Sequence, residues 1–384
     1  MLKKSIGKGG PKMKFLHTGD WHLGKKLGDF DLRQEQWDAF LKLVAIAKEE
    51  KVDAIVIAGD LYDSPRPNED SVALLNRMLV QLNLEEKYPL LMINGNHDSA
   101  VRLNTGNQWY RLNHFYLNTR LEDAFDPVEI GDCQFFLVPY FKLAQAKNYF
   151  DKDYQDLAQA MQDVVACCQE KFVVGKKHVF VGHFFAAGSL RSDSETKVEV
   201  GGLGAVPVDL FASFDYVALG HIHKANALQM DKVKYSGSPL KFSASEAKDK
   251  KGVWIVDTNM DAPYFREIQP LNDLYQLKGT VAELTRAEKR QEIPVGSYVS
   301  VIMTDEKPVF DSYERLLACY PHMFNLQRQT PAFSSTGFEV VAGVGEMQPT
   351  ELVQTFFSQV IGKDLEPADL ALVEDCLQKV GKED

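Results

Sequence analysis

Five short clusters of polar residues along the chain could together bind metal ions. They contain Asp20 and His22; Asp60; Asn96, His97 and Asp98; His183; and His221 and His223. Oxygen donors mixed with imidazoles suit borderline divalent metals such as manganese, iron or zinc. Two ions about 3.5–4 Å apart would need seven such ligands, one of them a carboxylate that both ions share. The clusters therefore predict a two-metal site.

The first cluster also resembles a phosphate-binding loop. Gly19, Gly24 and Lys25 have the spacing G-x-x-x-x-G-K-[ST]. Such a loop needs small residues whose amides surround phosphates, followed by a hydroxyl group for magnesium. Here Asp, Trp and His fill the loop and Lys26 replaces the hydroxyl residue, and the motif occurs nowhere else in the chain. The metal-binding interpretation is favoured, so any ATP must be bound by a partner.

Each cluster follows an apolar run that is typical of a buried strand. The segments are "MKFLHTGDWH", "DAIVIAGDLYD", "PLLMINGNHD", "HVFVGHF" and "FDYVALGHIH". Helices are expected between the first three, over residues 32–51 and over 68–84 with Asn68 as N-cap. The apolar face of the first helix should consist of Trp37, Phe40, Leu41, Val44 and Ala47. This alternation predicts an α/β layered fold, in which ligands bind beyond the carboxyl ends of the strands.

Other parts of the chain have a different character. Residues 1–12 are rich in lysine and glycine and aperiodic, which predicts a disordered extension, and Met13 could equally be the start. Two late strand patterns, 233–240 and 251–258, are expected to form a second, more antiparallel sheet.

The last third of the chain predicts a smaller domain and a helical end. The strand patterns "SYVSVIMTDE" and "FEVVAGVG", around an amphipathic helix at 311–320, indicate a small α+β domain. Beyond it, two amphipathic helical patterns are separated near Asp364 or Pro367. These last helices have little chain left to pack against, although they could pack back on their own domain.

The composition is that of an ordinary globular protein, with 45% hydrophobic and 25% charged residues. No window approaches the apolar length of a membrane span. Five cysteines form no C-x-x-C pattern, which favours a reducing cytoplasm. A net charge of −11 argues against binding nucleic acid by bulk electrostatics. It leaves room for a local basic groove, or for positive charge supplied by bound cations or a partner.

The ordered set D-x-H, GD, GNHD, GH and GH-x-H resembles the signature of the calcineurin-like metallophosphoesterases. The flanking sequences, such as "VDAIVIAGDLYD", "INGNHDS" and "YSGSP", are similar to nuclease subunits of bacterial double-strand-break repair complexes, densely over residues 13–260 and including the loop at 192–202. The resemblance implies a two-sheet α/β sandwich over 13–268, a small α+β capping and DNA-binding domain over 269–345, and a helical segment over 346–384. That segment would bind a coiled-coil ATPase.

The resemblance also implies a role for each polar residue. One ion, of manganese type, would be held by Asp20, His22, Asp60 and His223, and Asp60 would bridge to a second ion held by Asn96, His183 and His221. His97 would contact the scissile phosphate and protonate or steer the leaving oxygen, and Asp98 would orient His97. Asp63 stands where archaeal and eukaryotic relatives carry a histidine, and its role is left open.

Partner surfaces are predicted less specifically. Candidate contacts to the DNA backbone are Lys25, Arg66, Arg102 and Arg191. Helices near 69–84 and 102–112 match in position those that pair two nuclease subunits in the family, which implies a homodimer within a heterotetramer. The same apolar faces could also be ordinary core.

Three function classes are considered. The first is a DNA nuclease, for which the resemblance implies 3′→5′ exonuclease action on duplex ends, endonuclease action on single strands or hairpins, and dependence on the ATPase partner for full activity on duplex DNA. The second is a metallophosphoesterase of small molecules or phosphoproteins. Asn94 disfavours the phosphoprotein option, because those phosphatases carry arginine before their GNH cluster. The third is a non-enzymatic scaffold that binds a partner through its helical tail, and such a scaffold would have no use for seven costly polar groups around one pocket. The extra domain and helices favour the first.

Overall fold

The computed structural model describes residues 12–189, 204–329, 348–361 and 364–380. The chain forms two compact units, and each is described by itself. The first consists of the described part of Met1–Gln276 with Ile293–Ser300 and Pro321–Asn325, and the second consists of the described parts of Leu277–Glu292, Val301–Tyr320 and Leu326–Asp384. The domain boundaries expected at 268/269 and 345/346 stay predictions. The extension over 1–11, the loop at 192–202 and the strand expected at 338–345 lie outside the described residues.

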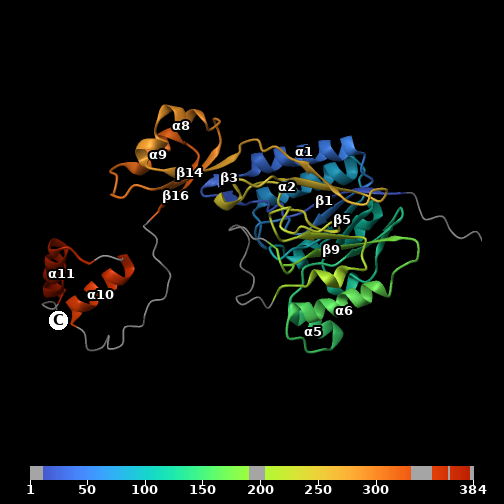
Figure 1. The fold of residues 1–384 in the computed structure, drawn as a ribbon. Helices are drawn as coiled ribbons and strands as arrows, with labels where there is room; N and C mark the ends of the chain where they lie inside the picture. The colour runs from blue at the N-terminus through green and yellow to red at the C-terminus, as the bar shows by residue number, and fades with distance from the viewer. Residues whose placement is uncertain (1–11, 190–203, 330–347, 362–363, 381–384) are drawn as a thin grey trace, which may run out of the picture. The chain divides into compact units, whose positions relative to one another are not determined.

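Two large sheets form most of the first unit, which also contains a two-stranded sheet of β2 (Lys26–Leu27) and β3 (Phe30–Asp31) (Figure 1). The six-stranded sheet has the order β13 (Tyr264–Glu267), β12 (Gly252–Asp257), β1 (Lys14–Thr18), β4 (Ala54–Ala58), β5 (Leu90–Ile93) and β6 (Phe115–Asn118). The five-stranded sheet has the order β11 (Val233–Tyr235), β10 (Tyr216–Gly220), β9 (Lys177–His183), β8 (Cys133–Leu137) and β7 (Val128–Ile130). Strands β1, β4, β5 and β6 pair in parallel, as do β8, β9, β10 and β11. Within each sheet, the carboxyl ends of these strands therefore share one edge.

The two sheets pack face to face on one apolar layer. Alternate residues of both sheets form it, among them Phe15 and Val56 from the first and Phe135 and Val181 from the second. The rings of Phe15 and Phe135 meet edge to face, with centroids 5.2 Å apart. Strands covered on both faces read as continuous apolar runs, which explains the runs seen in the sequence. The two-sheet α/β sandwich is confirmed.

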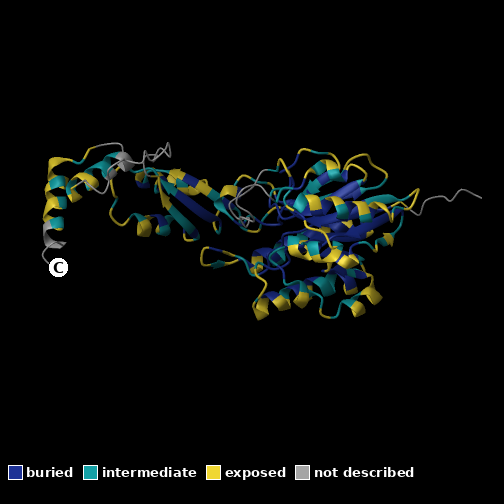
Figure 2. Ribbon diagram, turned by 90° about the horizontal axis from the view of Figure 1, so that it is seen from below, coloured by how far each residue is buried: buried dark blue, intermediate teal, exposed yellow. Residues whose placement is uncertain are grey.

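Helices cover the outer face of each sheet. Helices α1 (Arg33–Glu50) and α2 (Glu69–Leu79) pack on the first sheet, and α6 (Leu157–Gln169) packs on the second, close to α5 (Leu143–Phe150). Figure 2 shows their buried stripes and exposed outer faces. The predicted N-cap of α2 is confirmed, because the Asn68 side chain accepts a hydrogen bond from the Ser71 amide at 2.8 Å.

Several expectations need correction. On α1, Leu41 is exposed, and Leu43 is buried in its place. Strands β11 and β12 do not pair with each other: β11 lies parallel to β10, whereas β12 lies antiparallel to β1. A strand pattern indicates an extended segment but carries no information about its partner. The residues between these two strands lead the chain from one sheet to the other.

The helix expected near 102–112 is interrupted. It consists of α3 (Ala100–Leu103), α4 (Asn107–Tyr110) and the short 3₁₀ helix η2 (Arg111–Asn113). Gly106, with φ of 81°, breaks it. The helix expected over 68–84 is continuous, because the π-helical turn η1 (Val80–Glu85) follows α2 directly.

The second unit contains smaller elements. Strands β14 (Leu274–Gly279), β15 (Tyr298–Met303) and β16 (Met323–Arg328) form a three-stranded sheet whose residues are divided between the two units. Its helices are α7 (Val281–Leu284), α8 (Ala287–Gln291), α9 (Ser312–Cys319), α10 (Pro349–Ile361) and α11 (Pro367–Val380). Helix α9 and strand β15 were both predicted. The last helix begins at Pro367, one of the two predicted break points. No described helix is both long and apolar enough to cross a membrane.

Candidate metal centre

All five predicted clusters stand at the carboxyl ends of strands. Asp20 and Asp60 lie two residues beyond β1 and β4, and Asn96 lies three residues beyond β5. His183 is the last residue of β9, and His221 directly follows β10. Both sheets therefore contribute ligands, and the packing of one sheet on the other brings the two sets together.

The backbone of these loops is held in an unusual conformation. Positive φ angles occur at Asp20 (51°), His22 (44°), Asp60 (50°) and His221 (93°). Residues other than glycine rarely have a positive φ angle, and those that do cluster at functional sites. Backbone hydrogen bonds fix the first two loops to each other. The amide of Asp20 donates to the carbonyl oxygen of Gly59, and the amide of His22 donates to that of Asp60, both at 3.0 Å.

Two glycines allow the loops to approach one another closely. A Cβ atom on Gly95 would stand 2.1 Å from Oδ1 of Asp60, and one on Gly59 would stand 2.6 Å from Nδ1 of His183. Both distances are far shorter than a carbon atom tolerates. Glycine is therefore required at both positions by the position of the neighbouring ligand.

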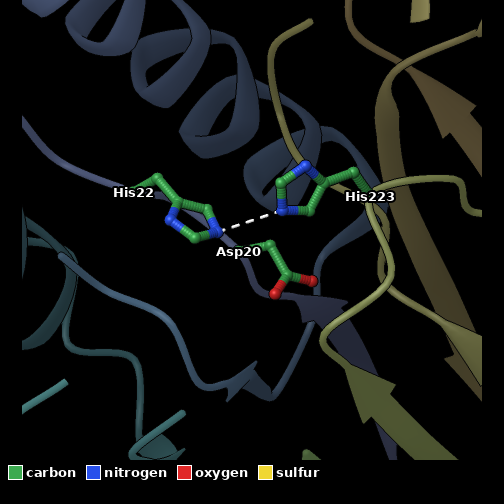
Figure 3. A group of neighbouring side chains, drawn as sticks. All are labelled: Asp20, His22 and His223. Atoms are coloured by element: carbon green, nitrogen blue, oxygen red, sulfur yellow. Dashed lines mark hydrogen bonds between the residues drawn. The ribbon is translucent and has the colours of Figure 1, made fainter. Parts of the chain in front are cut away.

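The first group of candidate ligands is Asp20, His22 and His223 (Figure 3). Their ligand atoms all lie within 4.8 Å of one another, and all three residues are buried. The Nε2 atoms of His22 and His223 are only 3.0 Å apart. Asp20 is oriented by the amide of His221 at 2.8 Å and by the hydroxyl of Ser236 at 3.2 Å. Two imidazoles that face each other beside a buried carboxylate fit a divalent ion.

The second group is centred on Asp60. Its Oδ2 lies 3.2 Å from Nε2 of His183 and 3.6 Å from Nε2 of His22, so one carboxylate reaches both groups. The Asn96 side-chain oxygen lies 2.9 Å from Nε2 of His183 and 2.9 Å from Nδ1 of His221. The seven predicted ligands thus meet in one place, with Asp60 between the two sets.

His97 and Asp98 are arranged differently from each other. The Nδ1 atom of His97 lies 2.9 Å from the carbonyl oxygen of Asp63, and its amide donates to Asp60. The ligand atoms of His97, His22 and Asp60 also lie within 4.8 Å of one another, which the sequence did not indicate. The Asp98 carboxylate accepts hydrogen bonds from the amides of Leu61, Tyr62 and Gly95. These three bonds hold the turn that carries His97, and the expectation that Asp98 orients His97 stays a prediction.

Burial sets the protonation of the site. Burial raises the pKa of Asp20 well above its usual range and lowers the pKa of His223 to about 4. Burial also opposes the charges of Asp60 and His183, but their mutual attraction outweighs it. That attraction lowers the pKa of Asp60 and raises the pKa of His183 to about 9. Burial and the charge of Asp60 raise the pKa of Asp98 to about 6. His223 is neutral at pH 7, as a metal ligand must be.

The candidate DNA contacts differ in their exposure. Lys25 donates to Asp63 at 2.8 Å and its side chain is only 17% exposed, so it is already engaged within the protein. Arg66 and Arg102 are exposed, and Arg191 lies outside the described residues.

The structure adds residues that sequence reasoning missed. Gln36, Ser236, Glu246 and Lys251 contact the candidate ligands. None belongs to a pattern with recognisable ligand spacing. The one signal in this region is "YSGSP", which contains Ser236 and supports the family resemblance without indicating a contact to Asp20.

A family model for calcineurin-like phosphoesterases matches residues 13–225. The fold and the buried carboxylate–imidazole cluster agree with that match, and the class is a metal-dependent phosphoesterase. A Staphylococcus saprophyticus protein, named as the SbcD component of the nuclease SbcCD, is 34% identical over 356 residues, which are 92% of this chain and 94% of that protein. The Staphylococcus epidermidis protein of the same name is 33% identical over 318 residues, 82% and 85% of the two chains. The chain therefore belongs to the SbcD nucleases of the calcineurin-like phosphoesterase family.

Two solved structures also match. A dimetal phosphatase from Danio rerio has a TM-score of 0.40 and 12% identity, and the match covers 68% of this chain and 98% of that one. The phosphoesterase Yfce from E. coli has a TM-score of 0.28 and 14% identity, covering 64% and 89%. Neither likeness bears on the family assignment.

Proposed function

We propose that this chain is the nuclease subunit of an SbcCD-type DNA repair complex and hydrolyses DNA phosphodiester bonds with two manganese ions. The observation that carries the proposal is the convergence of seven oxygen and imidazole ligands in one place, with Asp60 between histidines of both sets, in a chain of this nuclease family. When bound, two divalent cations supply positive charge for the phosphate oxygens and lower the pKa of water, as phosphodiester hydrolysis requires.

The contacts support one assignment of the ligands. Asp20, His22, Asp60 and His223 would hold the first ion, and Asp60, Asn96, His183 and His221 would hold the second. Asp60 faces histidines of both sets, as a shared ligand must. A neutral Asn96 in place of another carboxylate limits the negative charge that faces a phosphate.

His97 is proposed to contact the scissile phosphate and to protonate the leaving oxygen. A carbonyl oxygen can only accept, so Nδ1 of His97 carries the proton that it shares with Asp63. That hydrogen bond fixes the ring orientation, and a protonated Nε2 is then the atom that could donate to a leaving group. Asp98 is proposed to orient His97, and its carboxylate holds the turn of the GNHD cluster on three backbone amides.

The substrate and partners follow from the family. We propose 3′→5′ exonuclease action on duplex ends, endonuclease action on single strands and hairpins, and ATP dependence through an SbcC-type coiled-coil ATPase. A chain with a net charge of −11 cannot hold DNA by its bulk charge, so bound cations and the partner would supply attraction. Arg66, Arg102 and Arg191 are proposed to contact DNA phosphates.

Two surfaces are proposed for assembly. Helices α10 and α11 would bind the coiled coil of the ATPase, and two nuclease subunits would pair through the segment 100–113 beside α2. Three large apolar side chains of that segment, Val101, Trp109 and Leu112, are more than 70% exposed. A contiguous exposed apolar patch marks an interaction surface, and these three side chains are proposed to form one. The result would be a homodimer within a heterotetramer.

A nuclease assay tests the proposal. Linear duplex and hairpin DNA are incubated with the protein, with and without an SbcC-type partner and ATP, in Mn²⁺, Mg²⁺ or Zn²⁺. We expect cleavage in Mn²⁺, with duplex degradation only when partner and ATP are both present. Hydrolysis of nucleotides or phosphoproteins, but of no DNA under any condition, would replace this function by that of a small-molecule or protein phosphoesterase.

A further inference from the structure

Two carboxylates, each paired with a lysine, stand behind the histidines of the first ligand group. Glu246 is paired with Lys251, and Asp63 with Lys25. Neither carboxylate belongs to the seven candidate ligands. Glu246 faces Nδ1 of His223, and Asp63 faces Nδ1 of His22. The Nε2 atoms of the two rings face each other.

The pair behind His223 is fully buried. Oε1 of Glu246 lies 3.8 Å from Nδ1 of His223, and Oε2 accepts a hydrogen bond from Lys251 at 2.5 Å. The same ammonium group donates to the carbonyl oxygen of His223 at 2.8 Å and to Oγ of Ser238 at 3.0 Å. One lysine therefore fixes both the carboxylate behind the ring and the backbone that carries the ring.

His22 is held in a parallel way. Oδ1 of Asp63 lies 3.3 Å from its Nδ1 and 2.8 Å from Lys25, and the Gln36 amide donates to the His22 carbonyl oxygen at 2.8 Å. The Phe242 ring lies edge to face against both imidazoles, with centroids 5.6 Å from each. Both rings are thus restrained on the side away from the candidate ion.

Stability alone does not explain the buried lysine–glutamate pair. Removing two charges from water is costly, and replacing such a pair by apolar residues is often neutral or stabilising. A carboxylate on the far nitrogen of a metal-ligating histidine, by contrast, sets its tautomer and its orientation. In the second group, Nδ1 of His183 donates instead to the backbone carbonyl of Ala58, at 2.8 Å.

We propose that Glu246 and Asp63 are positioning residues that hold His223 and His22 with Nε2 directed at the first ion. The affinity for that ion then depends on two replaceable side chains, whereas the His183 ring of the second group is held by a backbone carbonyl that these substitutions leave in place. This inference rests on the metal centre proposed above. The affinity for the first ion could then be lowered by a mutation outside the ligand set, without a change in the affinity for the second ion.

Metal titration of Glu246→Gln tests the inference without an activity assay. Calorimetry with Mn²⁺ should show two equivalents bound, one of them about 10- to 100-fold more weakly than in the wild-type protein. The absorption spectrum of the Co²⁺-loaded protein should change in the band of the weakened ion only. Glu35→Gln is the matched control, because Glu35 is also a buried glutamate but contacts Tyr298 and Asn272. It should bind both ions as the wild-type protein does.

Further variants separate positioning from folding. If Glu246→Gln leaves Lys251 unpaired and does not fold, the double variant Glu246→Gln with Lys251→Met removes the charge pair together, and Asp63→Asn perturbs the other histidine at a partly exposed position. Each should weaken one ion. Wild-type affinity for both ions in the folded variants would overturn the inference. Binding of no metal by the wild-type protein would instead overturn the proposed metal centre.

Discussion

The candidate ligands are held in place at an energetic cost. Each residue with a positive φ angle, such as Asp20, His22 and Asp60, costs on the order of 1–3 kcal/mol. Asp20, Asp60 and Asp98 are buried, and burial together with the charge of Asp60 raises the pKa of the Asp20 and Asp98 carboxyl groups. Residues that compromise folding stability in this way indicate a site that is organised for cations.

The role of His97 can be tested by removing its ring. His97→Ala keeps the amide that donates to Asp60, so we expect both metal ions to stay bound. Loss of a general acid should lower the rate by about 10²- to 10⁴-fold. Elemental analysis of the variant and the hydrolysis rate of a simple phosphodiester measure the two effects. Fewer than two ions in the variant would show that His97 is a ligand, as its distance to His22 and Asp60 allows.

A histidine outside the site should make the fold acid-sensitive. His17 is fully buried with its Nδ1 2.9 Å from the Tyr216 hydroxyl, and burial lowers the pKa of His17 to about 3. Because the unfolded chain binds this proton near pH 6.5, stability is lost as the pH falls from about 6.5 towards 3. Between pH 7 and pH 5, protonation of this one group should lower the free energy of unfolding by about 2 kcal/mol.

Urea unfolding of metal-free protein at the two pH values measures this loss. His17→Gln lacks the titrating group, so its free energy of unfolding should fall by about 2 kcal/mol less over that interval than the wild-type value does. Other buried histidines contribute equally to both proteins and cancel in the difference. Equal losses in the two proteins would show that His17 does not titrate in this way.

At the level of secondary structure, the segment 100–113 differs from ordinary core helices. Two short helices broken at Gly106 leave Trp109 74% exposed, so the segment packs poorly within one chain. If two copies pair through it, Trp109→Glu should convert a dimer to a monomer in analytical ultracentrifugation. Val174→Glu is the control, because Val174 is also exposed but lies in a turn elsewhere. A dimer that survives the Trp109 substitution would place the pairing surface elsewhere.

For the whole molecule, hydrolysis and partner binding should be separable. All seven candidate ligands lie in the first unit, whereas α10 and α11 lie in the second. Truncation after residue 347 should abolish co-purification with an SbcC-type partner and leave Mn²⁺-dependent hydrolysis of a simple phosphodiester unchanged. Leu372→Lys alters one exposed apolar residue of α11 and should weaken the association in the same direction. Retained association in both variants would contradict the role of these helices.

Much of this molecule could be predicted because the signals are local. Continuous apolar runs that end in polar, glycine-containing turns identified five buried strands, and the seven candidate ligands with His97 follow from their residue types and order. Strand partners could not be predicted, and β11 and β12 consequently lie in different sheets.

The sequence by itself therefore determined the family, the sandwich and the candidate ligand set. Only the tertiary structure decided what supports each ligand. Asp98 binds loop amides, Lys25 binds Asp63, and Glu246 reaches His223 from 23 residues along the chain. Such contacts join residues that no periodicity or spacing relates, because they arise only when two sheets and their loops pack together.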